Sequence, residues 1–317
     1  MKTLWNWLPG VVDRRVRIAA WASLVSQILI IGTGGAVRLT GSGLGCPTWP
    51  RCTEDSFVST PEMGFHGLIE FGNRLLTFVL IIIAIAMFVF VLRIRKERPE
   101  LFRMALGLGL GIPGQAVIGG VTVLTNLNPY VVGLHYLLSA VLVGVAAVLV
   151  YRVRRGPKRT GWGVAPPVRA MGGALVGVLG ISVVMGILTT GSGPHAGDAG
   201  AARNGLDSWL LQHFHAWPSY IVLGLVVTLT ALAWFAGVGS PGYRRAITGS
   251  LGVTGVQILV GLVQANYGLP VLAVGIHMVL AAVLVGFVVT ALLAQREPVT
   301  AEAVGQSPLR GTVASSS

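Results

Sequence analysis

Charged residues are scarce in this chain: only 11% of its 317 residues are Asp, Glu, Lys or Arg, whereas 53% are hydrophobic. The mean hydropathy is +0.76. A soluble domain carries roughly a quarter of its residues as charges, so this composition excludes a soluble core. The chain is therefore expected to be an integral membrane protein embedded in a lipid bilayer.

Apolar runs long enough to cross a bilayer as helices, about 20 residues each, occur eight times. They lie near residues 17–37, 66–92, 103–124, 130–151, 168–190, 209–236, 245–265 and 270–294. We therefore predict an all-α integral membrane protein with eight transmembrane helices. No cleavable signal peptide is expected, because Met1–Gly10 lacks a basic segment followed by an apolar one.

Acidic residues are few, 11 against 23 Lys and Arg, which leaves a formal charge of +12. Such a charge can indicate nucleic-acid binding, but here the basic residues gather in alternate loops, as the positive-inside rule describes. These residues are Lys2, Arg14, Arg15, Arg17, Arg93, Arg95, Lys96, Arg98, Arg103, Arg152, Arg154, Arg155, Lys158, Arg159, Arg169, Arg244, Arg245, Arg296 and Arg310. The pattern predicts cytoplasmic termini and no nucleic-acid partner.

Cysteine is nearly absent, and the only two, Cys46 and Cys52, fall in the first outer loop. A zinc site would need further ligands, and none lie nearby in the sequence. Oxidation is permitted outside the cytoplasm. The pattern therefore favours a disulfide over a metal site.

A polar stretch opens the second apolar run. His66, Glu70 and Arg74 are spaced i, i+4, i+8, which places them on one face of a helix. Ionisable groups within the membrane usually face a cavity or the bundle interior and are functional candidates. The alternative is an intrahelical Glu70–Arg74 pair beside a hydrogen-bonded histidine.

Two motifs occur twice in the chain. Thr-Gly-Ser-Gly follows the first apolar run and again the fifth, and the sequence that begins at His135 returns at His277. Gln115 precedes the first of these histidines by 20 residues, and Gln257 precedes the second by the same interval. The chain therefore contains an internal repeat, with one copy in each half.

The repeat predicts two pseudo-symmetric four-helix bundles. We expect an N-terminal half over residues 1–152, a C-terminal half over 153–295 and a disordered cytoplasmic tail over 296–317. An even number of spans in each half makes the repeats parallel.

Each half carries one histidine near the outer end of its second helix and one near the outer end of its fourth. The pairs are His66 with His135 and His215 with His277, since the spacing from the preceding Thr-Gly-Ser-Gly favours His215 over His213. Two imidazoles from facing helices can hold a haem through its iron, whereas a bare metal ion needs more ligands. The sequence predicts two bis-histidine haem sites in the outer half of the membrane.

The two predicted sites differ one and two turns beyond the helix-two histidine. Glu70 and Arg74 occupy these offsets in the N-terminal half, and Ser219 and Leu223 occupy them in the C-terminal half. A carboxylate beside only one of the two sites indicates one reactive haem and one that passes electrons.

These features together resemble the haem A synthase family, membrane enzymes that oxidise the methyl group of haem O through a hydroxylated intermediate to the formyl group of haem A. The resemblance covers roughly residues 15–295. The matching segments are Thr-Gly-Ser-Gly-Leu-Gly-Cys46-Pro-Thr-Trp-Pro-Arg-Cys52, His66-x3-Glu70-x2-Asn73-Arg74, Thr-Gly-Ser-Gly-Pro-His195-Ala-Gly-Asp198 and the remaining histidines. Thr48 departs from the family, in which this position is often acidic.

The resemblance implies a role for each candidate. His66 and His135 would hold the substrate haem O, Glu70 would be the catalytic carboxylate, and His215 and His277 would ligate a resident haem b. The resemblance also implies a loop disulfide between Cys46 and Cys52, and Arg38 and Arg74 are candidate partners for haem propionates. It further implies a bacterial-type cell membrane, a haem O synthase as supplier and an electron donor that no motif identifies.

Two other functions remain open on the sequence. A dihaem cytochrome b that takes electrons from a quinol would explain the four histidines but not the one-sided Glu70. A haem or solute transporter would need polar residues along a midplane path, and the spans are polar chiefly at their outer ends. His195 is expected to be structural or solvent-exposed, and His213 has no assigned role.

Overall fold

The computed structural model describes residues 2–157 and 159–298, and in this part of the chain all regular secondary structure is helical, with no strand. The elements are α1 (Lys2–Trp7), α2 (Arg14–Leu39), the 3-10 turn η1 (Pro61–Met63), α3 (Gly64–Val91), α4 (Pro99–Leu124), α5 (Pro129–Arg155), α6 (Pro166–Ser192), α7 (Ser208–Phe235), α8 (Pro241–Asn266) and α9 (Val271–Ala294). Eight of these helices, α2 to α9, are long and apolar enough to cross a membrane. The predicted all-α class and the eight long helices are confirmed, whereas α1 was not predicted.

The long helices begin where local sequence favours a start. Asp13, Asn128, Asp207 and Ser240 accept hydrogen bonds from backbone N–H groups of the first turns of α2, α5, α7 and α8. Proline stands in the first turn of α4, α5, α6 and α8, where its missing N–H costs nothing. Short turns then return the chain across the bundle.

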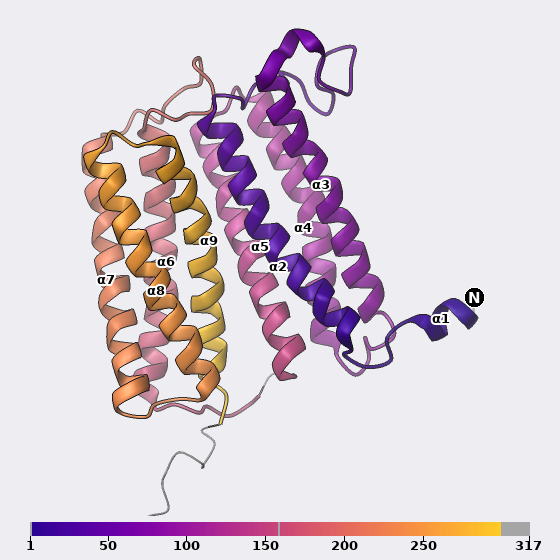
Figure 1. Ribbon diagram of the computed structural model, residues 1–317, viewed down its shortest axis with the longest axis vertical. Helices are drawn as coiled ribbons and strands as arrows, with labels where there is room; N and C mark the ends of the chain where they lie inside the picture. The colour runs from indigo at the N-terminus through magenta and orange to yellow at the C-terminus, as the bar shows by residue number, and fades with distance from the viewer. Residues whose placement is uncertain (1, 158, 299–317) are drawn as a thin grey trace, which may run out of the picture.

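The helices fall into two groups that stand side by side (Figure 1). In the first group α2 contacts α3 and α5, and α4 contacts the same two helices. In the second group α7 contacts α6 and α8, and α9 contacts the same two helices. Buried aliphatic side chains fill each group, around Val143 and Leu149 in the first and around Val226 and Ile247 in the second. This grouping agrees with two four-helix halves, and the symmetry between them stays a prediction.

Helix α9 also lies against the first group, where it contacts α2 and α5. The hydroxyl of Tyr136 on α5 donates to the carbonyl of Met278 on α9 at 3.4 Å, and the hydroxyl of Tyr151 donates to the carbonyl of Leu293 at 3.2 Å. Both pairs are 142 residues apart, which is the separation of His135 and His277. The two halves therefore meet through positions that correspond in the repeat.

The predicted tail, 296–317, is described only at Arg296, Glu297 and Pro298. Glu297 is buried and hydrogen-bonds to Tyr151 and Ser240. The expected disorder of the tail concerns residues 299–317, which lie outside the described residues.

Candidate functional site

His66 lies in the first turn of α3, and the end of α2 orients its ring. After α2 the chain turns back at Gly41, which has a positive φ of 67°, so that the Ser42 hydroxyl lies 2.9 Å from His66 Nδ1. Thr40 Oγ1 in turn lies 2.8 Å from Ser42 Oγ. This contact leaves Nε2 of His66 without a hydrogen bond to any described residue, and so available to bind a metal.

Glu70, one turn further along α3, is buried, with 5% of its surface exposed. Its Oε2 accepts the backbone N–H of Cys46 at 2.6 Å, and its Oε1 accepts Arg74 Nη2 at 2.5 Å. The intrahelical pair considered from the sequence is thus present. The carboxylate also fastens the first outer loop to α3, which the sequence pattern did not indicate.

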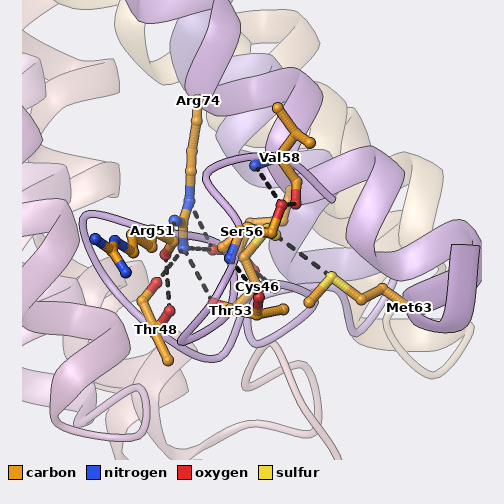
Figure 2. Close-up of a disulfide and its surroundings, with 10 residues drawn as sticks. Cys46, Thr48, Arg51, Thr53, Ser56, Val58, Met63 and Arg74 are labelled. Atoms are coloured by element: carbon orange, nitrogen blue, oxygen red, sulfur yellow. Dashed lines mark hydrogen bonds and ion pairs between the residues drawn. A yellow bond between two sulfur atoms is a disulfide. The ribbon is translucent and has the colours of Figure 1, made fainter. Parts of the chain in front are cut away.

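Arg74 completes this attachment (Figure 2). Its guanidinium donates to the backbone carbonyls of Cys46, Thr48 and Arg51 at 3.0–3.1 Å. Because these bonds use the guanidinium within the protein, a contact between Arg74 and a haem propionate stays a prediction.

The disulfide between Cys46 and Cys52 is present, as predicted, with their Cα atoms 4.4 Å apart. Both cysteines are fully buried. The disulfide closes the loop segment whose backbone carbonyls accept hydrogen bonds from Arg74 (Figure 2). It therefore restrains the positions of those carbonyls.

His135 lies near the start of α5 and packs against α4. A Cβ added at Gly119 would lie 3.3 Å from Cε1 of its ring, so the glycine makes room for the imidazole. Gln115, which the repeat singled out, donates through Nε2 to the carbonyl of His135 at 3.1 Å and to Ser139 Oγ at 2.7 Å. Nδ1 of His135 is buried and has no hydrogen-bond partner among the described residues.

The rings of the C-terminal pair lie close together in an edge-to-face arrangement. The ring centroids of His215 on α7 and His277 on α9 are 6.1 Å apart, at an interplanar angle of 73°. His215 Nδ1 lies 2.9 Å from the carbonyl of Ser182 on α6, so this nitrogen donates and Nε2 remains free. A Cβ at Gly186 would lie 3.0 Å from Cε1 of His215, and one at Gly261 would lie 3.9 Å from Cε1 of His277.

This separation would allow both imidazoles to bind one metal ion. A metal–imidazole bond is about 2.0–2.1 Å, so two rings across one metal ion have centroids roughly 6 Å apart. Nδ1 of His277 is buried without a described partner. Within residues 2–157 and 159–298, no group of three or more His, Cys, Asp or Glu side chains could hold a metal ion. The residues present therefore suit a haem better than a bare ion.

The two other histidines are placed differently. His213 is exposed, its Nδ1 lies 2.7 Å from the carbonyl of Trp209, and its ring packs on that indole at 4.2 Å between centroids. His195 Nε2 lies 2.9 Å from the carbonyl of Leu269 in the α8–α9 turn. His195 thus makes a structural contact, as the sequence suggested.

Arg38, at the end of α2, points toward the C-terminal half. Its Nε donates to the carbonyl of His195 at 2.6 Å and its Nη2 to the carbonyl of Thr190 at 3.0 Å. The guanidinium therefore joins the outer loops of the two halves, and its contact with a haem propionate stays a prediction.

Sequence reasoning did not identify two residues that orient the ligands, Ser42 and Ser182. The Thr-Gly-Ser-Gly motif that contains Ser42 was interpreted only as a turn. Its repetition ahead of each helix-two histidine was the available signal. Ser182 acts through its backbone carbonyl, which no side-chain pattern reveals.

Comparison with known proteins finds one matching family and several similar curated proteins. The sequence profile of the COX15-CtaA family, described as cytochrome oxidase assembly protein, matches residues 17–289. A haem A synthase from Geobacillus thermodenitrificans is 30% identical over 149 residues, which is 46% of each chain. Those from Geobacillus kaustophilus and Lysinibacillus sphaericus are 28% and 27% identical over 149 and 144 residues. These matches span about half the length of the curated relatives.

Proposed function

The chain belongs to the COX15-CtaA family of cytochrome oxidase assembly proteins, and from this premise we propose that it is a haem A synthase. The substrate would be haem O, whose methyl group is oxidised through a hydroxylated intermediate to the formyl group of haem A. The enzyme would work within the cell membrane, with its arginine-rich end and both termini in the cytoplasm. Haem O synthase would supply the substrate, and the electron donor has no assigned identity.

The observation that carries the proposal is the geometry of the C-terminal histidines. Their ring centroids are 6.1 Å apart, close enough for both imidazoles to bind one iron, and each ring lies against a glycine of a neighbouring helix. His215 and His277 would hold haem b, which supplies reversible one-electron redox chemistry when bound. Ser182 would fix the tautomer of His215, so that Nε2 faces the iron.

The substrate would be held by His66 and His135 in the half comprising residues 1–152. Ser42 leaves Nε2 of His66 available, and Gly119 makes room for the ring of His135. This half differs from residues 153–295 in being covered by a disulfide-closed loop. Substrate must enter and product must leave this site, so a loop that can open suits the N-terminal half.

Glu70 would act on the methyl group as proton acceptor or as stabiliser of developing positive charge. Loss of a methyl hydrogen as a proton needs a base, and a buried carboxylate nearby can serve as one. An ionised carboxylate offers about four acceptor positions. Contacts with Cys46 and Arg74 occupy part of this capacity, so acceptance of a proton remains compatible with the structural contacts.

Haem extraction tests the proposal. The protein is purified from a host that makes haem O, and the extracted haems are separated by chromatography. We expect haem b together with haem O, its hydroxylated intermediate or haem A. Protein from the same host without haem O synthase serves as the control and should hold haem b. Haem b alone from the first host would contradict the enzyme and favour an electron carrier.

A further inference from the structure

A cavity of about 330 Å³ lies at the arginine-rich end of the bundle, far from the histidines. It is lined by the last turn of α5, the first turns of α8 and the residues that follow α9. Helix α9 contacts both α5 and α8, but α5 and α8 do not contact each other. Arg152 and His135 are 17 positions apart on α5, so at about 1.5 Å per residue the cavity lies roughly 26 Å from that histidine.

Positive charge dominates the lining of this cavity. Five arginines, Arg152, Arg155, Arg159, Arg245 and Arg296, line it together with one carboxylate, that of Glu297. The carboxylate is already satisfied, because it accepts from the Ser240 hydroxyl at 2.5 Å, the Tyr151 hydroxyl at 3.0 Å and Arg155 Nε at 3.2 Å. The other four arginines of the lining form no ion pair with a carboxylate among the described residues.

Arg152 is the buried member of this set. Only 8% of its surface is exposed, and its guanidinium makes no hydrogen bond or ion pair with any described residue. Its nearest described aromatic partner is the ring of Tyr151, 5.7 Å away. A buried charge without a partner is costly unless a counter-charge is bound. The guanidinium fork matches phosphate oxygens in geometry and charge.

The residues around the cavity indicate which phosphate-bearing molecule could supply the counter-charge. Trp162 is half-exposed, and Arg296 stacks on its indole at 3.7 Å from the ring centroid. Tryptophan at the end of apolar helices typically marks the level of the lipid headgroups. Basic pockets between transmembrane helices on the cytoplasmic side bind anionic headgroups. We propose that this cavity binds the phosphate of an anionic membrane lipid, with Arg152 as the buried contact and Arg245 and Arg296 at the opening.

The test measures thermal unfolding of the full-length protein in a neutral detergent. Three probes are titrated: phosphatidylglycerol, phosphatidylcholine with the same acyl chains, and inorganic phosphate. A ligand that binds the folded protein raises the melting temperature with its concentration. We expect a saturable rise with phosphatidylglycerol and none with the other two at equal concentration. Equal stabilisation by the two lipids, or saturation by inorganic phosphate alone, would overturn the proposal.

Matched variants locate the site. Arg152→Gln should weaken the apparent affinity for phosphatidylglycerol about tenfold, as expected for the loss of one charge-assisted contact. Arg154→Gln removes the same charge from an exposed position on the same turn that does not line the cavity, and should change the affinity less than about twofold. Equal weakening by the two variants would show diffuse surface attraction and contradict the site.

Arg245→Gln provides a second test in case Arg152→Gln, a substitution at a buried position, fails to fold. Arg245 is exposed at the opening, so its replacement does not threaten the core, and we expect about threefold weaker binding. An affinity equal to that of Arg154→Gln would count against the proposal even if Arg152→Gln fails to fold. Haem content should be unchanged in all three variants, so this result is independent of the proposed haem chemistry.

Discussion

The two halves place their histidines alike but support them with different kinds of structure. In the N-terminal half the helix-two histidine is oriented by the Ser42 side chain, which belongs to the outer loop. In the C-terminal half His215 is oriented by the carbonyl of Ser182 within α6. Loops open more readily than the interior of a helix. Under the proposed function, the difference would separate a site that exchanges its haem from a site that keeps it.

The residue one turn beyond these histidines shows the same division. Glu70 bonds to the outer loop, whereas Ser219, at the corresponding position, bonds to Ser182 and to the carbonyl of His215 within the helix pair. Near its helix-two histidine, the N-terminal half therefore has a carboxylate bonded to the outer loop, and the C-terminal half has a hydroxyl bonded within the helices. Under the proposed function, chemistry belongs to this half and electron transfer to the other.

Removal of one histidine from each half should have the largest effect. His277→Ala removes one of the two proposed ligands of haem b and should abolish haem b binding while haem O still binds. His66→Ala should abolish retention of the substrate haem while haem b stays. Haem per protein, measured by absorbance and chromatography, checks both. If each variant lost both haems equally, the two sites would not be independent.

Glu70→Gln should have the next largest effect, on turnover rather than on haem binding. The amide keeps the size of the side chain but accepts no proton, so we expect formation of haem A to fall at least about a hundredfold. Ser219→Ala should stay within about twofold. The ratio of haem O, hydroxylated intermediate and haem A in membranes that contain each variant is the measurement.

Arg74→Gln separates the chemical role of Glu70 from its structural role. It removes the bonds from Arg74 to the loop carbonyls but leaves the Glu70 carboxylate and its bond to the Cys46 N–H in place, so it should retain clearly more activity than Glu70→Gln. Equal loss in the two variants would show that Glu70 matters only through the loop.

Ser42→Ala should weaken retention of the substrate haem about tenfold, because partners that orient a metal ligand typically contribute at this level. Ser192 occupies the corresponding position in the second Thr-Gly-Ser-Gly, but its hydroxyl donates to the carbonyl of Thr189 and contacts no histidine. Ser192→Ala is therefore the matched control and should leave both haems unchanged. The measurement is the resistance of the protein-bound haems to removal by a competing iron ligand. Equal retention in the two serine variants would contradict the role of Ser42.

Replacement of both Cys46 and Cys52 by serine should have the smallest effect. A disulfide that closes a short loop contributes ~2 kcal/mol, and the contacts of Arg74 and Glu70 still hold the loop. We expect a decrease of a few fold in haem A formation, with haem b content unchanged. A loss of haem b as large as the loss of activity would show that the loop supports the whole fold rather than the N-terminal site.

Hydropathy predicted the eight long helices because each apolar run is as long as a bilayer is thick. The short helix α1 escaped this test, since a helix of 6 residues has no span to detect. The cysteine pair was predicted because closure of a short loop depends on sequence separation. Such features are local in the chain.

The partners of the charged residues were harder to predict. Arg38 and Arg74 were expected to meet haem propionates, yet their guanidinium groups donate to backbone carbonyls, including those of Thr190 and His195 more than 150 residues from Arg38. A carbonyl has the same chemistry in every residue, so the sequence gives no sign of which one an arginine reaches. Ser182 was missed for the same reason.

The hydrogen bond from Tyr136 to the carbonyl of Met278 has a consequence for the passage of electrons. Each of these residues follows a histidine in the chain, His135 on α5 and His277 on α9. One candidate ligand in each half is therefore joined to the other by two short stretches of main chain, the Tyr136 side chain and a single hydrogen bond. With both histidines bound to haem, this bridge would be a direct route between the halves, its length set by the packing of α5 against α9 and independent of the outer loops. Opening of the loop over the substrate would then leave the length of the route unchanged.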